Sequence, residues 1–115
     1  MTPQDFVSQL GAEVVDKNYA TYRSLLLNTS ASKALDPYWQ RVLVLFGELT
    51  DEQREVLLEL TRHVTIDAVA NVLGVIDGTL ELADADDAFH LTYAGQELGG
   101  ELQGTFLELA EQAGP

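Results

Sequence analysis

The chain has 115 residues, a formal net charge of −13 and no cysteine, and 46% of its residues are hydrophobic. The length suits one globular domain over residues 1–115, and the hydrophobic content is too high for a disordered chain. The absence of cysteine excludes disulfides, thiolate nucleophiles and cysteine-ligated metals, while so acidic a surface repels nucleic-acid phosphates and anionic lipids.

Three features of the first five residues mark the start of a helix. Thr2 offers a capping hydroxyl, Pro3 occupies the first helical position, and Asp5 places an acid in the first turn. Apolar and aromatic side chains then recur at helical spacing. This pattern predicts a helix over residues 3–27, weakened locally at Gly11 because glycine has a low helix propensity.

Two further helix starts follow. Asp36 and Pro37 repeat the cap and proline, which predicts a helix from there to residue 47 or 48. Its continuous apolar segment at residues 42–46 would suit a buried strand equally well, but the proline start favours a helix. Thr50 and Gln53 form a capping box, so a third helix is expected from this point to Ile76.

Beyond Gly78 the apolar pattern changes from helical to alternating. Residues 80–82 and 89–93 each offer one apolar and one polar face, and four residues, 84–87, supply an acidic turn between them. The simplest product is an antiparallel β-hairpin with His90 on its polar face.

A last helix should carry Leu102, Phe106 and Leu109 on one side, at spacings of four and three residues. The fold class expected is therefore α+β, mainly α. It comprises about four helices, with a small antiparallel β-hairpin between helices three and four.

Four segments together resemble a group of small bacterial proteins with no assigned function. They are residues 50–53 (TDEQ), 63–78 (HVTIDAVANVLGVIDG), 93–98 (YAGQEL) and 106–109 (FLEL). The resemblance would cover most of residues 36–111, and helix caps, apolar positions and turn glycines carry it. It implies a bacterial source and a stand-alone small protein, and it brings no catalytic residue to this chain.

One polar line stands out on the third predicted helix. His63, Asp67 and Asn71 follow one another at intervals of four residues, so their side chains share a face of an otherwise apolar segment. They are the candidate ligand- or partner-binding residues, because an imidazole beside a carboxylate can bind a metal or be held in one tautomer. Catalytic zinc normally needs three protein ligands, and this line alone does not supply them. The line could equally be structural, with His63 paired to Asp67 and Asn71 bonded to backbone or another subunit.

Other constellations lack what their chemistry requires. The acids at residues 77–87 match no register of an EF-hand loop, the glycines lack the spacing of a phosphate-binding loop, and the serines have no nucleophile-elbow context. No catalytic residue, metal or cofactor is therefore assigned. Tyr38 and Trp39, beside Arg41, either seal the end of the core or, if exposed as a patch, anchor a partner.

The distribution of charge directs the functional hypothesis. All six Lys and Arg lie in residues 1–62, whereas residues 63–115 carry ten Asp or Glu and no Lys or Arg. Such a surface steers basic partners, so we expect a non-enzymatic protein that binds another, basic protein, such as an immunity or inhibitory factor. The alternative is a small-molecule binder or small enzyme with a pocket near His63, Asp67 and Asn71.

Localisation and oligomeric state follow from the same patterns. No basic region followed by an apolar run opens the chain, and no apolar stretch is long enough to span a bilayer, so the protein is expected to be soluble and cytoplasmic. Apolar residues occur on nearly every side of the third helix between residues 66 and 76. We therefore expect a homodimer, with this helix in the interface or at the centre of the fold.

Overall fold

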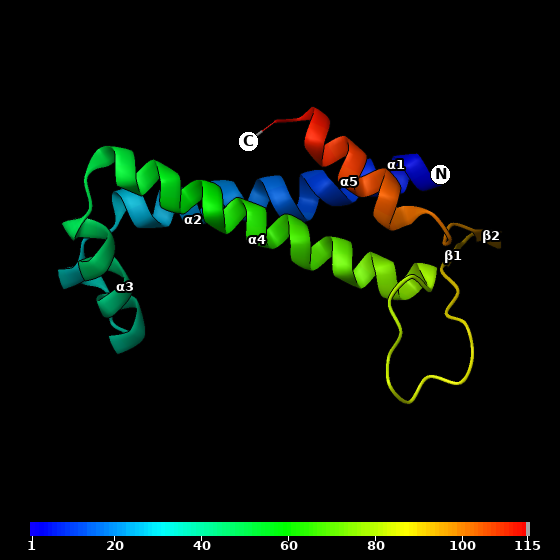
Figure 1. Ribbon diagram of the computed structural model, residues 1–115. Helices are drawn as coiled ribbons and strands as arrows, with labels where there is room; N and C mark the ends of the chain where they lie inside the picture. The colour runs from blue at the N-terminus through cyan, green and yellow to red at the C-terminus, as the bar shows by residue number, and fades with distance from the viewer. Residues whose placement is uncertain (115) are drawn as a thin grey trace.

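The molecule begins with one long helical stretch that changes geometry part-way. In the computed structural model, which describes residues 1–114, α1 (Pro3–Leu10), the π-helical segment η1 (Gly11–Asp16) and α2 (Lys17–Asn28) follow one another directly (Figure 1). The Thr2 hydroxyl accepts the Asp5 N–H at 3.0 Å, and the Asp5 carboxylate accepts the Thr2 N–H at 3.1 Å. The predicted helix start is confirmed, and the expected weak point coincides with the glycine that opens η1.

The next two helices also begin where their caps predict. After the 3₁₀ turn η2 (Ala31–Lys33), α3 (Pro37–Glu48) starts behind Asp36, whose carboxylate accepts the Tyr38 N–H at 2.8 Å. The apolar segment that would also suit a strand is therefore helical. The longest helix, α4 (Asp51–Asp77), spans about 40 Å at 1.5 Å per residue and forms the central rod of the molecule (Figure 1).

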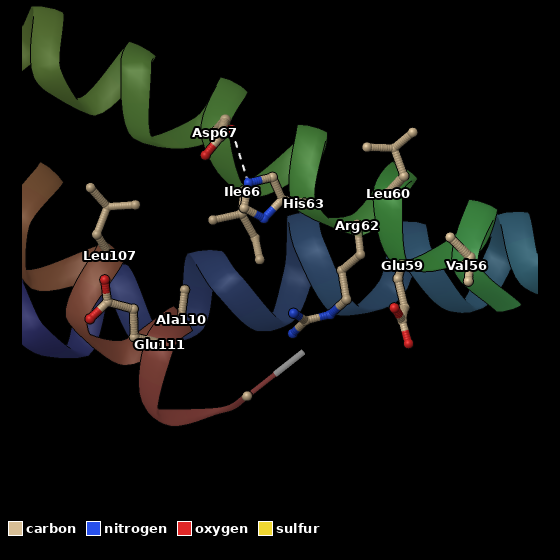
Figure 2. A pocket seen from close by; sticks show the side chains of 11 residues that line it. Val56, Glu59, Leu60, Arg62, His63, Ile66, Asp67, Leu107, Ala110 and Glu111 are labelled. Atoms are coloured by element: carbon tan, nitrogen blue, oxygen red, sulfur yellow. Dashed lines mark ion pairs between the residues drawn. The ribbon is translucent and has the colours of Figure 1, made fainter.

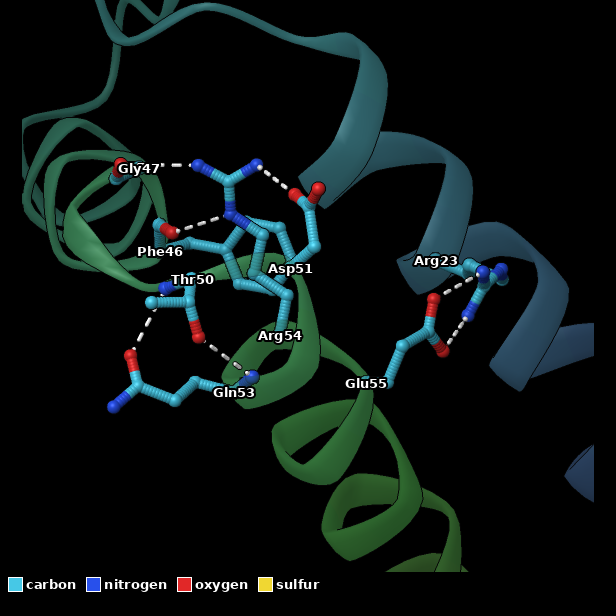
Figure 3. A network of polar contacts seen from close by, with 8 residues as sticks. All are labelled: Arg23, Phe46, Gly47, Thr50, Asp51, Gln53, Arg54 and Glu55. Carbon is cyan, nitrogen blue, oxygen red and sulfur yellow. Dashed lines mark hydrogen bonds and ion pairs between the residues drawn. The ribbon is translucent and has the colours of Figure 1, made fainter.

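The corner between α3 and α4 is closed by reciprocal hydrogen bonds (Figure 3). The Thr50 hydroxyl accepts the Gln53 N–H at 3.1 Å, and the Gln53 side-chain oxygen accepts the Thr50 N–H at 2.9 Å. Arg54 donates to the carbonyl oxygens of Phe46 and Gly47, both at 3.0 Å. The last carbonyls of a helix lack helical partners, so Arg54 satisfies two of them and holds the end of α3 at the start of α4.

An ion pair joins α2 to α4. The Arg23 guanidinium donates to both carboxylate oxygens of Glu55, at 2.6 and 2.7 Å (Figure 3). These hydrogen bonds lower the pKa of Glu55 below its ordinary value and raise the pKa of Arg23. Both side chains remain partly exposed, so the pair fixes the position of α2 along α4 more than it stabilises the fold.

The β-hairpin lies later in the chain than predicted. β1 (Thr92–Tyr93) pairs antiparallel with β2 (Gln96–Glu97) across the turn residues Ala94 and Gly95. Both turn residues have positive φ, 49° and 82°, as in the two-residue turns whose twist matches that of hairpin strands.

The predicted strand at residues 80–82 and the predicted acidic hairpin turn at 84–87 were wrong. Residues 80–90 form an exposed loop, in which Leu82 and Phe89 are 51% and 48% exposed. An alternating pattern makes a strand only where its apolar face has something to cover, and here no other element faces the loop closely enough to bury these side chains.

The mainly helical architecture is confirmed for residues 1–114. It comprises four helices, counting α1, η1 and α2 as the first, and one two-stranded antiparallel hairpin. The hairpin follows α4 and precedes α5 (Leu102–Gln112), so it does not lie between α3 and α4. The labels differ from the predicted numbering because the π-helical segment divides the first predicted helix into α1 and α2. The third and fourth predicted helices therefore correspond to α4 and α5.

The last residue of α4 positions α5. The Asp77 carboxylate accepts the N–H groups of Gly100, Leu102 and Gln103 at 2.8, 3.1 and 2.7 Å. α5 has no side-chain cap from the residue that precedes it, Glu101. Two of its free N–H groups, those of Leu102 and Gln103, are therefore satisfied from the end of α4, which places the start of α5 against that helix.

The main core lies where α1, η1, α4 and α5 meet. Its buried members are Val7, Val15, Ile66, Ala70, Leu73, Leu102 and Phe106. The first two positions of the predicted apolar face of α5, Leu102 and Phe106, are 0% and 3% exposed. A smaller buried group, comprising Leu43, Phe46 and Leu58, lies at the α3 end of the molecule.

The molecule is elongated. Its radius of gyration is 17.7 Å, against about 13 Å for a compact domain of this length, and it measures 50 × 33 × 23 Å. Figure 1 shows α3 and the loop after α4 projecting from opposite ends of α4, on the side away from α5. Within residues 1–114, no helix combines the length and apolar character needed to cross a membrane.

Candidate functional site

A groove of about 590 Å³ lies between α4 and the C-terminal part of α5 (Figure 2). From α4, apolar side chains of Val56, Leu60 and Ile66 line it, and from α5 those of Leu107 and Ala110. Val56 and Leu60 are 60% and 55% exposed, so the apolar surface of the groove is open to solvent. Asp77 of α4 holds the start of α5, and α5 then slopes away from α4 toward its C-terminal end, where the groove lies (Figure 1).

Two of the three residues of the predicted polar line reach this groove. His63 Nε2 lies 3.4 Å from Asp67 Oδ2, with side chains 72% and 59% exposed. Asn71 is also exposed, but it does not line the groove. The structure therefore divides the line, with the His63–Asp67 pair in the groove and Asn71 further along α4.

The charge of the groove is predominantly negative. Glu59, Asp67 and Glu111 place three carboxylates along it (Figure 2). Arg62 also lines the groove, but its guanidinium donates to Asp16 at 3.2 Å, so its charge is already compensated. His63 also lines the groove, and it lies beside Asp67. The carboxylates of Glu59 and Glu111 form no hydrogen bond or ion pair with the residues that the structure describes.

This arrangement is better suited to binding than to a reaction. His63 and Asp67 can hold an imidazole in one orientation, but both are mostly in water, where a proton-transfer pair gains little from its neighbour. Over residues 1–114, no three His, Asp or Glu side chains converge as a metal-binding group. Apolar surface edged by carboxylates can instead receive a ligand that is itself apolar on one side and cationic at its edges.

The remaining candidates from the sequence lie elsewhere. Asp77 is engaged in capping α5, and the acids at residues 81–87 lie in the exposed loop. His90 Nδ1 lies 3.3 Å from Glu97 Oε1 beside the hairpin.

The aromatic residues at the start of α3 form a small partly exposed cluster. Tyr38 meets Trp39 edge to face, with ring centroids 5.5 Å apart, and Trp39 lies 6.1 Å from Tyr22 of α2. Arg41 sits over the Tyr38 ring at 5.9 Å. Tyr38 and Tyr22 are 55% and 46% exposed, so these rings seal the α2–α3 contact only in part.

The sequence does not identify several other residues of the groove, which are Glu59 on α4 and Leu107, Ala110 and Glu111 on α5. The reason is that nothing in the sequence shows which side of α4 receives α5. The available indication was the amphipathic pattern of the last helix, in which Leu107 and Ala110 lie beside the buried face.

No protein-family model matches the sequence, and comparisons with curated proteins and with solved structures found no match. The resemblance to small bacterial proteins therefore stays a prediction.

Proposed function

We propose that the protein is a non-enzymatic interaction protein that binds a basic amphipathic helix of another protein in the α4–α5 groove. The observation that carries this proposal is the composition of the groove, in which apolar side chains from both helices lie beside the carboxylates of Glu59, Asp67 and Glu111. An amphipathic helix with lysine or arginine beside its apolar face matches both features.

The dimensions of the groove are compatible with such a ligand. Its lining on α4 runs from Val56 to Asp67, which is about 16 Å or three helical turns. Three turns present apolar anchors at i, i+4 and i+7, the spacing by which an amphipathic helix is recognised in a groove. Leu60 and Leu107, on opposite walls, are positioned to contact such anchors.

The net charge of −13 supports a basic partner. An acidic field raises the rate at which a cationic partner arrives, and rim carboxylates then select its orientation. An immunity or inhibitory protein directed at a basic target is the form of this function that the charge favours.

The alternative, a small-molecule binder or small enzyme at His63, Asp67 and Asn71, has weaker support. Small-molecule sites enclose most of their ligand. Here the His63–Asp67 pair is mostly exposed, and Asn71 lies outside the groove.

Binding of a labelled amphipathic peptide made of leucine and lysine, followed by fluorescence anisotropy, tests the proposal. We expect the double variant Glu59→Gln/Glu111→Gln to weaken binding about tenfold, from two exposed charge pairs. The control Glu48→Gln/Glu81→Gln removes the same net charge at exposed positions outside the groove. It should change the affinity less than twofold.

Two results would refute the proposal. One is an equal loss of affinity in both double variants, which would mean that the peptide responds to overall charge. The other is equal binding of a peptide in which glutamate replaces lysine. If His63→Ala and Asp67→Asn leave peptide binding intact but abolish binding of a small ligand, the alternative function replaces this one.

A further inference from the structure

One face of α4 carries a continuous row of uncharged side chains, of which the four middle ones are exposed to solvent. Its positions recur at spacings of four and three residues, the period of a helix pair. We call this row the seam; its members are Leu57, Thr61, Val64, Ala68, Asn71 and Val75. Val64 is 57% exposed, and Val72, which follows Asn71 in the sequence but lies outside the seam, is 61% exposed. Leu57 and Val75, at its two ends, are half-buried.

The solvent-accessible surface of the molecule is too large for its mass. It amounts to 8037 Å², whereas a folded monomer of 12.6 kDa exposes about 6,200 Å². The excess, about 1,800 Å², is close to what each copy contributes to an obligate homodimer, about 1,000–2,500 Å². The seam therefore lies on a molecule whose uncovered area matches one missing partner of its own kind.

The order of residues in the seam matches itself when reversed. If two α4 helices cross antiparallel with Ile66 at the midpoint, Val64 of one copy faces Ala68 of the other, and Leu57 faces Val75. The same register sets Thr61 against Asn71. Apolar residues then meet apolar residues, and the two polar residues meet each other, as a two-fold symmetric interface requires.

The polar pair can be satisfied across this contact. The Thr61 hydroxyl donates to the Leu58 carbonyl at 2.7 Å, which leaves its oxygen free to accept a hydrogen bond. Asn71 has no hydrogen-bond partner among residues 1–114, and its amide N–H can donate to that oxygen in the second copy. The two-fold axis makes two such pairs, one for each copy, and polar pairs in an apolar helix contact fix its register.

We infer that the protein forms an antiparallel homodimer through the α4 seam, with Asn71 as its register-setting residue. The second copy lies between α3 and the loop after α4, which project on the same side of the molecule (Figure 1). The groove lies on the side of α4 that faces α5, so it stays open in the dimer.

Sedimentation equilibrium of the full chain tests the dimer. We expect Val64→Asp to weaken self-association about 100-fold or more, because it places two unpaired carboxylates in the interface. Leu35→Asp, which adds the same charge at a side chain 97% exposed outside the seam, should leave it within about twofold. A wild-type monomer at high concentration, or equal effects of both substitutions, would overturn the inference.

Cysteine pairing tests the orientation. The chain has no cysteine, so Thr61→Cys and Asn71→Cys each introduce a single thiol. Oxidation of a mixture of the two variants should yield a crosslinked heterodimer. Either variant alone should not crosslink, because its two thiols lie about 15 Å apart along an antiparallel pair. Crosslinking of either variant alone would show a parallel pair, and no crosslinking in the mixture would exclude this register.

Discussion

Replacing Asp77 tests whether α4 holds the start of α5 through this one carboxylate. The Asp77 carboxylate accepts three N–H groups from the segment that starts α5, at 2.7–3.1 Å, and two of these bonds are partly buried. In Asp77→Ala these donors lose their acceptor, and only the exposed Gly100 N–H turns readily to water. We therefore expect α5 to detach at its first turn.

The magnitude follows from the number and kind of bonds. Loss of an ordinary helix cap costs about 1 kcal/mol, and a hydrogen bond to a charged group contributes about 1.5–3 kcal/mol. Since the three bonds share one carboxylate and are not additive, we expect Asp77→Ala to lower the free energy of unfolding by about 3 kcal/mol. Asp77→Asn keeps an oxygen for Gly100 and Leu102 but sets an amide NH₂ against Gln103, so it should cost about half as much.

Urea unfolding followed by circular dichroism, at one fixed protein concentration, measures these differences. Asp84→Ala is the matched control, because it removes the same charge from an exposed residue that forms no hydrogen bond within the described part of the chain. It should change the free energy of unfolding by less than about 0.5 kcal/mol. A loss of that size in Asp77→Ala, or a greater loss in Asp77→Asn than in Asp77→Ala, would refute the capping argument.

Three other predictions concern single positions. Ala94→Asn should raise the free energy of unfolding in urea by about 0.5–1 kcal/mol, because Ala94 has φ 49° and Asn followed by Gly95 suits a two-residue turn. Ala94→Val should lower the free energy of unfolding, because a β-branched residue is strained at positive φ. Gly104→Ala should also stabilise, by about 0.5–1 kcal/mol, since an added Cβ meets nothing within 4 Å in α5. Arg23 lowers the pKa of Glu55 in the folded state. The contribution of the Arg23–Glu55 pair to the free energy of unfolding is therefore present above the ordinary pKa of 4.5 and is lost as the pH falls through the lowered pKa. The difference in Tm between wild type and Glu55→Gln should therefore shrink on acidification below 4.5, and a constant difference would contradict it.

The sequence predicts the helices well because their starts are set locally. Thr2, Asp36 and Thr50 each bond to amides two or three residues away, so the cap can be recognised without knowledge of the fold. The β-strands depend on packing against other elements as well as on the local pattern. The alternation at residues 80–82 resembles a strand, but only packing against another element would make it one, whereas the turn at Ala94 is closed by backbone geometry.

The site is only partly predictable for a related reason. The spacing of His63 and Asp67 places them side by side on any helix, and the structure has them 3.4 Å apart. Whether they share a groove with Asn71 depends on where α5 docks. That position is set by Asp77, through hydrogen bonds to residues more than twenty positions away. A contact of this range leaves no local pattern from which to infer it.

Opposite responses to salt distinguish the two proposed surfaces of α4. The groove offers exposed carboxylates to a cationic ligand, so salt, which screens charges over about 8 Å at physiological ionic strength, should weaken peptide binding. The seam contains no charged side chain, while each copy carries −13, so dimerisation must overcome repulsion that salt reduces. Between low and moderate salt, self-association should therefore strengthen while peptide affinity falls. If both weaken, the dimer is held by charge and the seam is misassigned; if both strengthen, the groove binds through apolar contact and its carboxylates do not select the partner.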